Sequence, residues 1–359
     1  MKKSLINNKH ILYFGIAIAI IIILILVQIL DPYIFDRITF LMQQSFFFMI
    51  PLMIVALGGM FSERSGIINI ALDGKMILGA FTSISFISFI QSGDFPVFLS
   101  GQFLLILALI VAAITGIIIG FIHAYASISL RANQIISGVA INMFAPAFAI
   151  YVARIFGNTQ RVAFHNDFHI PSVPLLGDIP IIGPLFFQQT YTTTFIGFAI
   201  LAIAAFVLYK TRFGLRLRSC GEHPQAADSV GINVYLIRYA GVLISGALAG
   251  MGGLIYIIPI TTAFSGSVDG YGFLALAVLI FGAWKPLRIM FAAFFFGFAS
   301  AIANGFTGIP SLLALGIPAP FYRMLPYIAT LIILAITSSK ATKSLGPKAA
   351  GVPYDKGGR

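Results

Sequence analysis

The chain has 359 residues, of which 59% are hydrophobic and only 9% are charged, and its formal net charge is +11. Soluble domains carry about 25% charged residues, so this composition and a mean hydropathy of +0.99 exclude a water-soluble protein and predict an all-α polytopic membrane protein. The basic residues are scattered between apolar runs, so we expect them to meet the lipid bilayer and not nucleic acid.

The first apolar run, 11–30, follows a basic start and is longer than the apolar region of a signal peptide, so we expect a retained span. Nine further runs follow at 38–60, 75–90, 97–125, 134–155, 192–209, 239–260, 272–284, 289–305 and 322–337. The run 272–284 is too short to cross about 30 Å of hydrocarbon as a straight helix. We expect it to begin outside the lipid or to be partly re-entrant.

Charge sets the orientation of these ten runs. Threading them alternately from a cytoplasmic N-terminus places 18 of the 22 Lys and Arg inside, Lys75 among them, and only Arg37, Arg154, Arg161 and Arg323 outside. This bias follows the positive-inside rule. We therefore expect both termini in the cytoplasm.

The second run ends in a polar break at 62–66, after which Asn69 and Asp73 are embedded in apolar sequence. Broken helices and polar groups are unfavourable in lipid unless they line a cavity or are buried in protein, which predicts an element of a transport pathway. The alternative is a tight cytoplasmic hairpin in which Glu63 and Arg64 are solvated and Asp73 caps the next helix.

Four more amide side chains lie beside or inside the apolar runs. Amides can hydrogen-bond a ribose hydroxyl or a purine edge, but they also serve as polar contacts between helices. Both interpretations stay open at this stage. The candidates for a translocation pathway or substrate site are Asn69, Asp73, Asn133, Gln134, Asn142 and Asn304.

The stretch 156–189 alternates prolines with apolar residues. It is too broken for a span and too apolar for a free linker. We expect a lid along the outer membrane face, where a substrate-binding protein docks. His165 and His169 lie here four residues apart, but in a Pro-rich loop they indicate surface histidines and no metal site.

The interruption 210–238 is rich in Lys and Arg, so we expect it in water. Pro224 suits a first helical position and Gly231 suits the left-handed residue that closes a helix, which leaves about two turns between them. Ala226 and Ala227 would give this helix a flat face that another protein approaches closely. The alternative is a solvated loop between spans.

We expect one transmembrane domain, 1–337, followed by a basic, disordered cytoplasmic tail, 338–359. The chain lacks a P-loop, because the stretch from Gly346 to Gly351 is followed by Val352 and Pro353 where the motif requires Lys and then Ser or Thr, so energy must come from a partner subunit or an ion gradient. The single cysteine, Cys220, excludes an internal disulfide framework and a Cys-based metal cluster.

Five stretches carry recognisable motifs: GGMFSERSGIINIALDGKMILGAF at 58–81, ANQIISGVAINMFAP at 132–146, CGEHPQAADSVGINV at 220–234, SGALAGMGGLIY at 245–256 and GYGFLALAVLIFGAWKP at 270–286. In this order they resemble the branched-chain amino acid and simple-sugar permease family of ABC importers. The form FSERSG followed by NIALDG is similar to the nucleoside branch of that family. Asp73 departs from the Glu that the family commonly has there.

The resemblance implies about ten transmembrane helices and a short cytoplasmic coupling helix that docks into a separate ABC ATPase. That ATPase would use ATP and Mg, whereas this chain would bind no cofactor and would not be an enzyme. The implied docking residues are Gly221, Glu222, His223, Pro224, Ala226, Ala227 and Gly231.

Further partners implied by the resemblance are a second, related permease subunit in a heterodimer, an extracytoplasmic substrate-binding lipoprotein and a nucleoside. The implied location is the bacterial cytoplasmic (inner) membrane.

A simple sugar is the alternative substrate. An ion-coupled secondary transporter is the alternative class, and a break at 69–74 mirrored by 270–275 would suit inverted repeats in either class. A secondary transporter needs no docking helix and should carry carboxylates at mid-membrane, which we do not expect here.

Overall fold

The computed structural model describes residues 33–93, 101–157, 159–180, 182–308, 310–339 and 346–356. The expected first span, 11–30, lies outside the described residues. Within them, seven helices are long and apolar enough to cross a membrane, and shorter apolar helices accompany them. The prediction of an all-α polytopic membrane protein is therefore confirmed.

Each apolar run from residue 38 onward coincides with one helix. The helices are α2 (Ile34–Arg64), α3 (Leu72–Ser92), α4 (Gly101–Ala124, extended by the π-helical η2, Tyr125–Ser129), α5 (Gln134–Gly157), α6 (Thr192–Lys210), α9 (Val234–Ile260), α10 (Tyr271–Phe281), α11 (Pro286–Gly305) and α14 (Leu325–Ser339). At about 1.5 Å per residue, α10 is roughly 16 Å long, which is too short to span the hydrocarbon.

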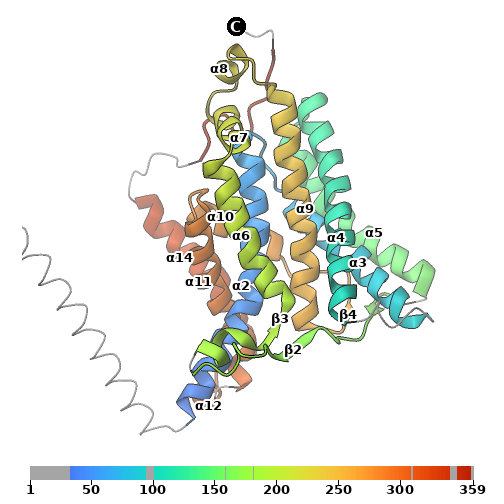
Figure 1. Ribbon diagram of the computed structural model, residues 1–359, viewed down its shortest axis with the longest axis vertical. Coiled ribbons are helices and arrows are strands. Elements are labelled where there is room, and N and C mark those ends of the chain that lie inside the picture. The colour runs from blue at the N-terminus through green and yellow to red at the C-terminus, as the bar shows by residue number, and fades with distance from the viewer. Residues whose placement is uncertain are drawn as a thin grey trace, which may run out of the picture.

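Short elements mark the two ends of the bundle (Figure 1). One end, called here the α8 end, carries α7 (Arg212–Glu222) and α8 (Pro224–Ser229). The other, called here the strand end, carries two small antiparallel sheets, in which β1 (Val162–Ala163) pairs with β4 (Ala263–Phe264) and β2 (His169–Ser172) pairs with β3 (Gln188–Tyr191). The remaining short helices are η3 (Gly183–Phe187), η4 (Phe306–Gly308), α12 (Pro310–Leu313) and α13 (Ala319–Arg323).

Helices α2 and α9 form the centre of the bundle. In the apolar 18-residue stretch of α2, 94% is buried inside the protein, whereas in that of α5 only 22% is. Large apolar side chains on α4 and α5, such as Ile114 and Phe144, are exposed. In a soluble protein such a surface would be unfavourable, whereas here it suits contact with lipid or with another membrane subunit.

Small residues bring α4 and α9 into backbone contact, as expected for helix packing in a membrane. A Cβ atom added at Gly116 would lie 2.0 Å from the carbonyl oxygen of Gly246. One added a turn further on, at Gly120, would lie 3.2 Å from the carbonyl oxygen of Val242, so only the first position has no room for a methyl group.

Gly116→Ala is therefore expected to lower the unfolding temperature of the detergent-solubilised protein by about 1–4 °C, because overpacking costs about 1–3 kcal/mol and the temperature shift per kcal/mol is small in a chain of this length. Gly120→Ala is the matched control and should change it by less than half as much. Equal unfolding temperatures for the two variants would contradict the close contact between α4 and α9.

Candidate functional site

The N-termini of two helices, α3 and α10, meet inside the bundle. After α2 ends, residues 67–70 run without helical structure, and α3 begins at Leu72. The N-terminus of α10 lies against this start: the backbone N–H of Gly272 donates to Oδ1 of Asp73 at 2.9 Å. A Cβ added at Gly272 would lie 2.2 Å from Cα of Asp73, so this approach requires glycine. The breaks expected at 69–74 and 270–275 thus come together.

Asp73 is a buried carboxylate, 8% exposed, between the N-termini of two helices. Helix N-termini carry partial positive charge and free N–H groups, which stabilise a carboxylate. Asp73 acts as a cap, as the alternative interpretation expected, but it caps α10 through Gly272. From the sequence we expected no carboxylate at mid-membrane, whereas Asp73 is a carboxylate buried inside the helical bundle.

Amide side chains of α5 hold the non-helical segment. Asn142 accepts from the N–H of Gly74 at 2.8 Å and donates to the carbonyl of Ile70 at 2.9 Å. Gln134 accepts from the N–H of Ile68 at 2.8 Å. These bonds satisfy backbone groups that a broken helix leaves unpaired and that lipid cannot satisfy.

A second set of contacts ties the same segment to α9. Asn69, which is fully buried, donates to the hydroxyl of Ser245 at 2.8 Å, and Nζ of Lys75 donates to Oδ1 of Asn69 at 2.8 Å. Lys75 is 0% exposed, so its side chain lies inside the protein and not in water, as its inclusion among the cytoplasmic residues implied. The nearby ring of His123 lies 3.2 Å from the carbonyl of Ile68. Sequence reasoning missed Lys75 and His123 as site residues, although both interrupt apolar sequence.

The other two predicted pathway residues lie elsewhere. Asn133 is exposed and caps α5, where its side-chain oxygen accepts from the N–H of Ile135 at 2.9 Å. Asn304 lies on α11 and donates to the carbonyl of Ser300 at 2.9 Å. The geometry at the junction therefore favours polar contacts between helices for Asn69, Asp73, Gln134 and Asn142.

The predicted short helix of the charged loop is present as α8, which begins at Pro224 and is followed by Gly231 in the left-handed region, with φ at +83°. A second helix, α7, precedes it and was not predicted. Ala226 is exposed, but Ala227 is only 3% exposed. The expected flat face of two alanines is therefore wrong, because Ala227 packs inward; His223 remains exposed.

Helix α7 is linked to the end of α2 by charge. Arg64 and Glu222 form an ion pair at 3.4 Å, in which the Arg64 side chain is 14% exposed and Glu222 44%. Glu63 accepts from the indole N–H of Trp284 at 2.6 Å, and Arg64 donates to the Trp284 carbonyl at 3.4 Å. The alternative in which Glu63 and Arg64 are solvated is therefore wrong.

Residues 346–356, called here the C-terminal strap, cross the α8 end. The N–H of Ala349 donates to the carbonyl of Gly221 at 2.9 Å, and the N–H of Gly351 donates to the carbonyl of Gly66 at 3.1 Å. Ala349 is buried. The expectation of a disordered tail is wrong for this part of it, because its backbone joins α7 to the turn after α2.

Arginines fix the second half of the strap. Nη1 of Arg238, a residue only 1% exposed, donates to the carbonyl of Val352 at 3.0 Å, and its guanidinium lies 5.8 Å from the centre of the Tyr354 ring. Arg131 donates to both carboxylate oxygens of Asp355, at 3.1 and 3.3 Å. The strap thus provides one hydrogen-bond acceptor, the carbonyl of Val352, and an aromatic ring for a buried cation, whose burial without partners would be unfavourable.

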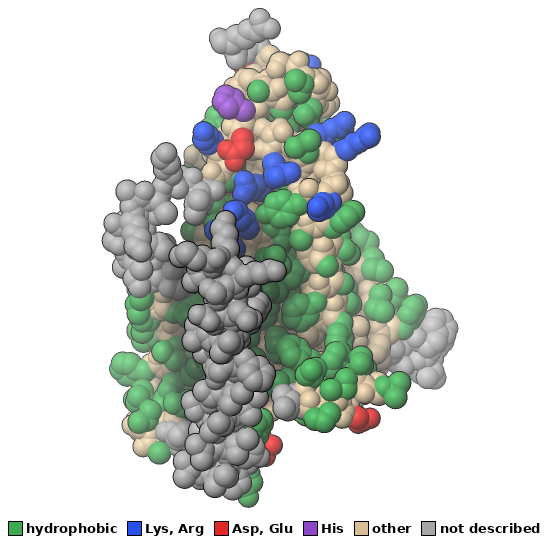
Figure 2. All heavy atoms as spheres, turned by 60° about the vertical axis from the view of Figure 1, so that its left-hand side comes forward, with side chains coloured by type: hydrophobic (Ala, Val, Ile, Leu, Met, Phe, Trp, Pro, Cys, Tyr) green, Lys and Arg blue, Asp and Glu red, His purple; other side chains and the backbone are tan. Residues whose placement is uncertain are grey.

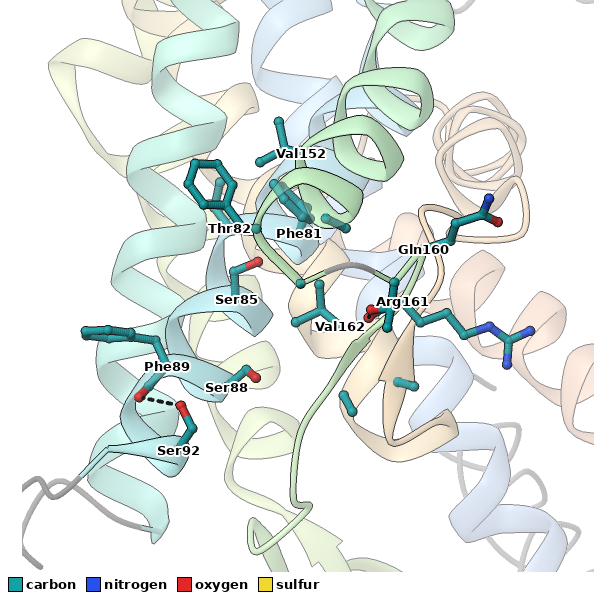
Figure 3. A pocket seen from close by; sticks show the side chains of 16 residues that line it. Phe81, Thr82, Ser85, Ser88, Phe89, Ser92, Val152, Gln160, Arg161 and Val162 are labelled. Atoms are coloured by element: carbon teal, nitrogen blue, oxygen red, sulfur yellow. Dashed lines mark hydrogen bonds between the residues drawn. The ribbon is translucent and has the colours of Figure 1, made fainter.

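A cavity of about 1070 Å³ opens between α3 and α5 toward the strand end (Figure 3). Ser85, Ser88 and Ser92 line it from α3, and Phe81 and Val152 supply apolar walls. Gln160 and Arg161, which follow α5, complete its polar lining. Among the described residues, no group of three His, Cys, Asp or Glu could hold a metal ion.

Comparison with known proteins connects this geometry to a family. Residues 41–334 match the family model described as branched-chain amino acid transport system / permease component. The guanosine ABC transporter permease protein NupQ of Bacillus subtilis (strain 168) is 45% identical, over 86% of this chain and 94% of that protein. No solved structure shows a significant match.

Two permeases of Lactococcus lactis subsp. cremoris are also similar. The nucleoside ABC transporter permease protein NupC is 42% identical, over 85% of this chain and 93% of that protein. The nucleoside ABC transporter permease protein NupB of the same strain is 27% identical, over 83% of this chain and 84% of that protein.

Truncation after residue 345 tests the strap. It should raise hydrogen–deuterium exchange in α7 and α8 at least fivefold and lower the unfolding temperature, because Arg238 loses an acceptor and stays buried. Removal of 357–359 alone is the control and should leave both unchanged. If the longer truncation also leaves exchange in α7 and α8 unchanged, the strap does not hold them.

Proposed function

The chain belongs to the permease-component family of the branched-chain amino acid transport system, and from this premise we propose that it is the membrane subunit of an ATP-driven ABC importer of nucleosides. The observation that carries the proposal is 42–45% identity to nucleoside and guanosine ABC transporter permeases over most of the chain. A simple sugar is the alternative substrate.

We place the α8 end in the cytoplasm of a bacterial cell, where a separate ABC ATPase that uses ATP and Mg docks on α8. Lys and Arg side chains gather near this end, above a largely hydrophobic surface (Figure 2). Such a distribution follows the positive-inside rule. Both termini then lie in the cytoplasm, and the strand end faces the extracytoplasmic binding lipoprotein.

Force from the ATPase has a short route to the helix junction. Movement of α8 acts on α7, and the pair of Glu222 and Arg64 joins α7 to the end of α2. Residues 67–70 connect that end to Asp73 and the N-terminus of α10. ATP drives transport only if the ATPase binds one access state of this chain more tightly than the other.

A second, different permease completes the pore in this proposal. Two nucleoside permeases of one Lactococcus strain match this chain, one at 42% and the other at 27% identity. The unequal identities favour a heterodimer in which this chain takes the place of the more similar protein. An ion-coupled transporter is less favoured, because such a transporter has no use for a docking helix like α8.

Proteoliposomes that hold the complete complex test the function. Uptake of tritiated guanosine or uridine should require ATP on the ATPase side and the binding lipoprotein on the other. Uptake driven by a proton or sodium gradient without ATP would contradict it, and uptake of ribose or glucose instead of nucleosides would change the substrate.

In the same assay, Ala226→Trp should abolish ATP-driven uptake by obstructing the docking surface, whereas Ala226→Ser should retain it.

Thiol labelling tests the orientation. Burial raises the pKa of the Cys220 thiol to about 11, against the opposing effect of Arg238, so the wild-type chain should stay unlabelled on both sides. Ser172→Cys should react with an impermeant maleimide in intact cells. His223→Cys should react only after the membrane is opened. The reverse result for these two variants would invert the topology.

A further inference from the structure

A second cavity, of about 400 Å³, lies between the ends of α9, α10 and α11 and the segment formed by α13 and α14. Its size falls within the range of small-molecule sites. Its lining is richer in functional groups than that of the cavity beside α3. The residues that matter for the argument are Tyr256, Asp269, Tyr271, Asn304, Arg323 and Tyr327.

Two tyrosines form a fixed aromatic wall. The rings of Tyr256 and Tyr271 lie 4.1 Å apart between centroids, and both residues are buried. The Tyr256 hydroxyl donates to Asp269 at 2.9 Å, which fixes this wall. Tyr327, from α14, is 54% exposed, so one aromatic ring of the cavity is open to a ligand.

The polar residues of the cavity are accessible. Asp269, Asn304 and Arg323 are all exposed, although they lie in an apolar domain. Asp269 lies in the loop between β4 and α10, and Arg323 ends α13, so the two charged groups lie in short connecting elements and not in the middle of a span, where charge is strongly unfavourable. Asn304 uses its N–H on Ser300, which leaves its side-chain oxygen to accept.

We propose that this cavity binds a nucleoside on its way across the membrane, an inference that rests on the proposed function. The base has an aromatic face, and a tyrosine ring stacks on such a face whichever polar groups the edge of the base carries. Arg323 donates paired N–H groups, which match the O6 and N7 acceptors of a 6-oxopurine. Asp269 and Asn304 supply acceptors for amino or ribose hydroxyl groups.

Kinetics of uptake by the complete complex in proteoliposomes test the site. Tyr327→Ala should raise the KM for tritiated guanosine about tenfold, because it removes a stacking surface. Tyr327→Phe keeps the ring and should change the KM less than threefold. Tyr151→Ala, which truncates an exposed tyrosine on α5, is the control and should leave the KM unchanged.

The ratio of the KM values for guanosine and adenosine tests direct contact with the base, because a residue with only a structural role would not change this ratio. Arg323→Gln should raise the KM for guanosine at least fivefold more than the KM for adenosine, because adenosine lacks the O6 acceptor. Asn304→Ala should raise both. Wild-type KM values and wild-type selectivity in Tyr327→Ala, Asn304→Ala and Arg323→Gln would overturn the proposal.

The outcomes for the site and for the function differ. If the wild-type complex transports nucleosides and the cavity variants do so with unchanged KM, only the site is wrong. If the wild-type complex transports no nucleoside, the proposed function fails and the site fails with it. If Tyr327→Ala does not assemble, Tyr327→Leu, which also removes the aromatic ring, takes its place with the same expected rise in KM.

Discussion

The interruption between α2 and α3 is the constraint on which the other contacts depend. Inside lipid, the backbone N–H and C=O groups of a broken helix have no water to bond. Asn142 and Gln134 of α5 meet three of these groups, and Asp73 binds the N–H of Gly272 on α10. Helices α3, α5 and α10 are therefore held in one arrangement by hydrogen bonds and not by apolar packing alone.

The same interruption connects the junction to the α8 end. The turn that leads into it, at Gly66, accepts a hydrogen bond from Gly351 of the strap, and the strap also bonds Gly221 of α7. Arg64, two residues before that turn, pairs with Glu222. Backbone and charge contacts thus converge on the end of α2, and this end is the point through which movement at α7 and α8 reaches the membrane domain.

Much of the fold and part of the site could be predicted from the sequence. Apolar run length located the helices, and Pro224 with Gly231 located α8, because these signals are local. The inward packing of Ala227, the burial of Lys75 and the position of the strap were missed. Each depends on partners distant in the chain, such as Gly221 for Ala349 and Asn69 for Lys75. A count of charged residues predicts the orientation of the spans, but it does not predict the burial of one lysine whose amide partner lies inside the protein.

Helix α10 joins the junction to the cavity beside α14. Gly272, which the carboxylate of Asp73 holds, directly follows Tyr271, whose ring belongs to the cavity wall. The polar groups at the junction are largely occupied by the protein itself, which suits a hinge, whereas those of the cavity are accessible, which suits a ligand. A ligand against Tyr271 acts one residue from the contact between the N-termini of α3 and α10. It shifts the balance between access states if it binds one arrangement of α10 more tightly than the other.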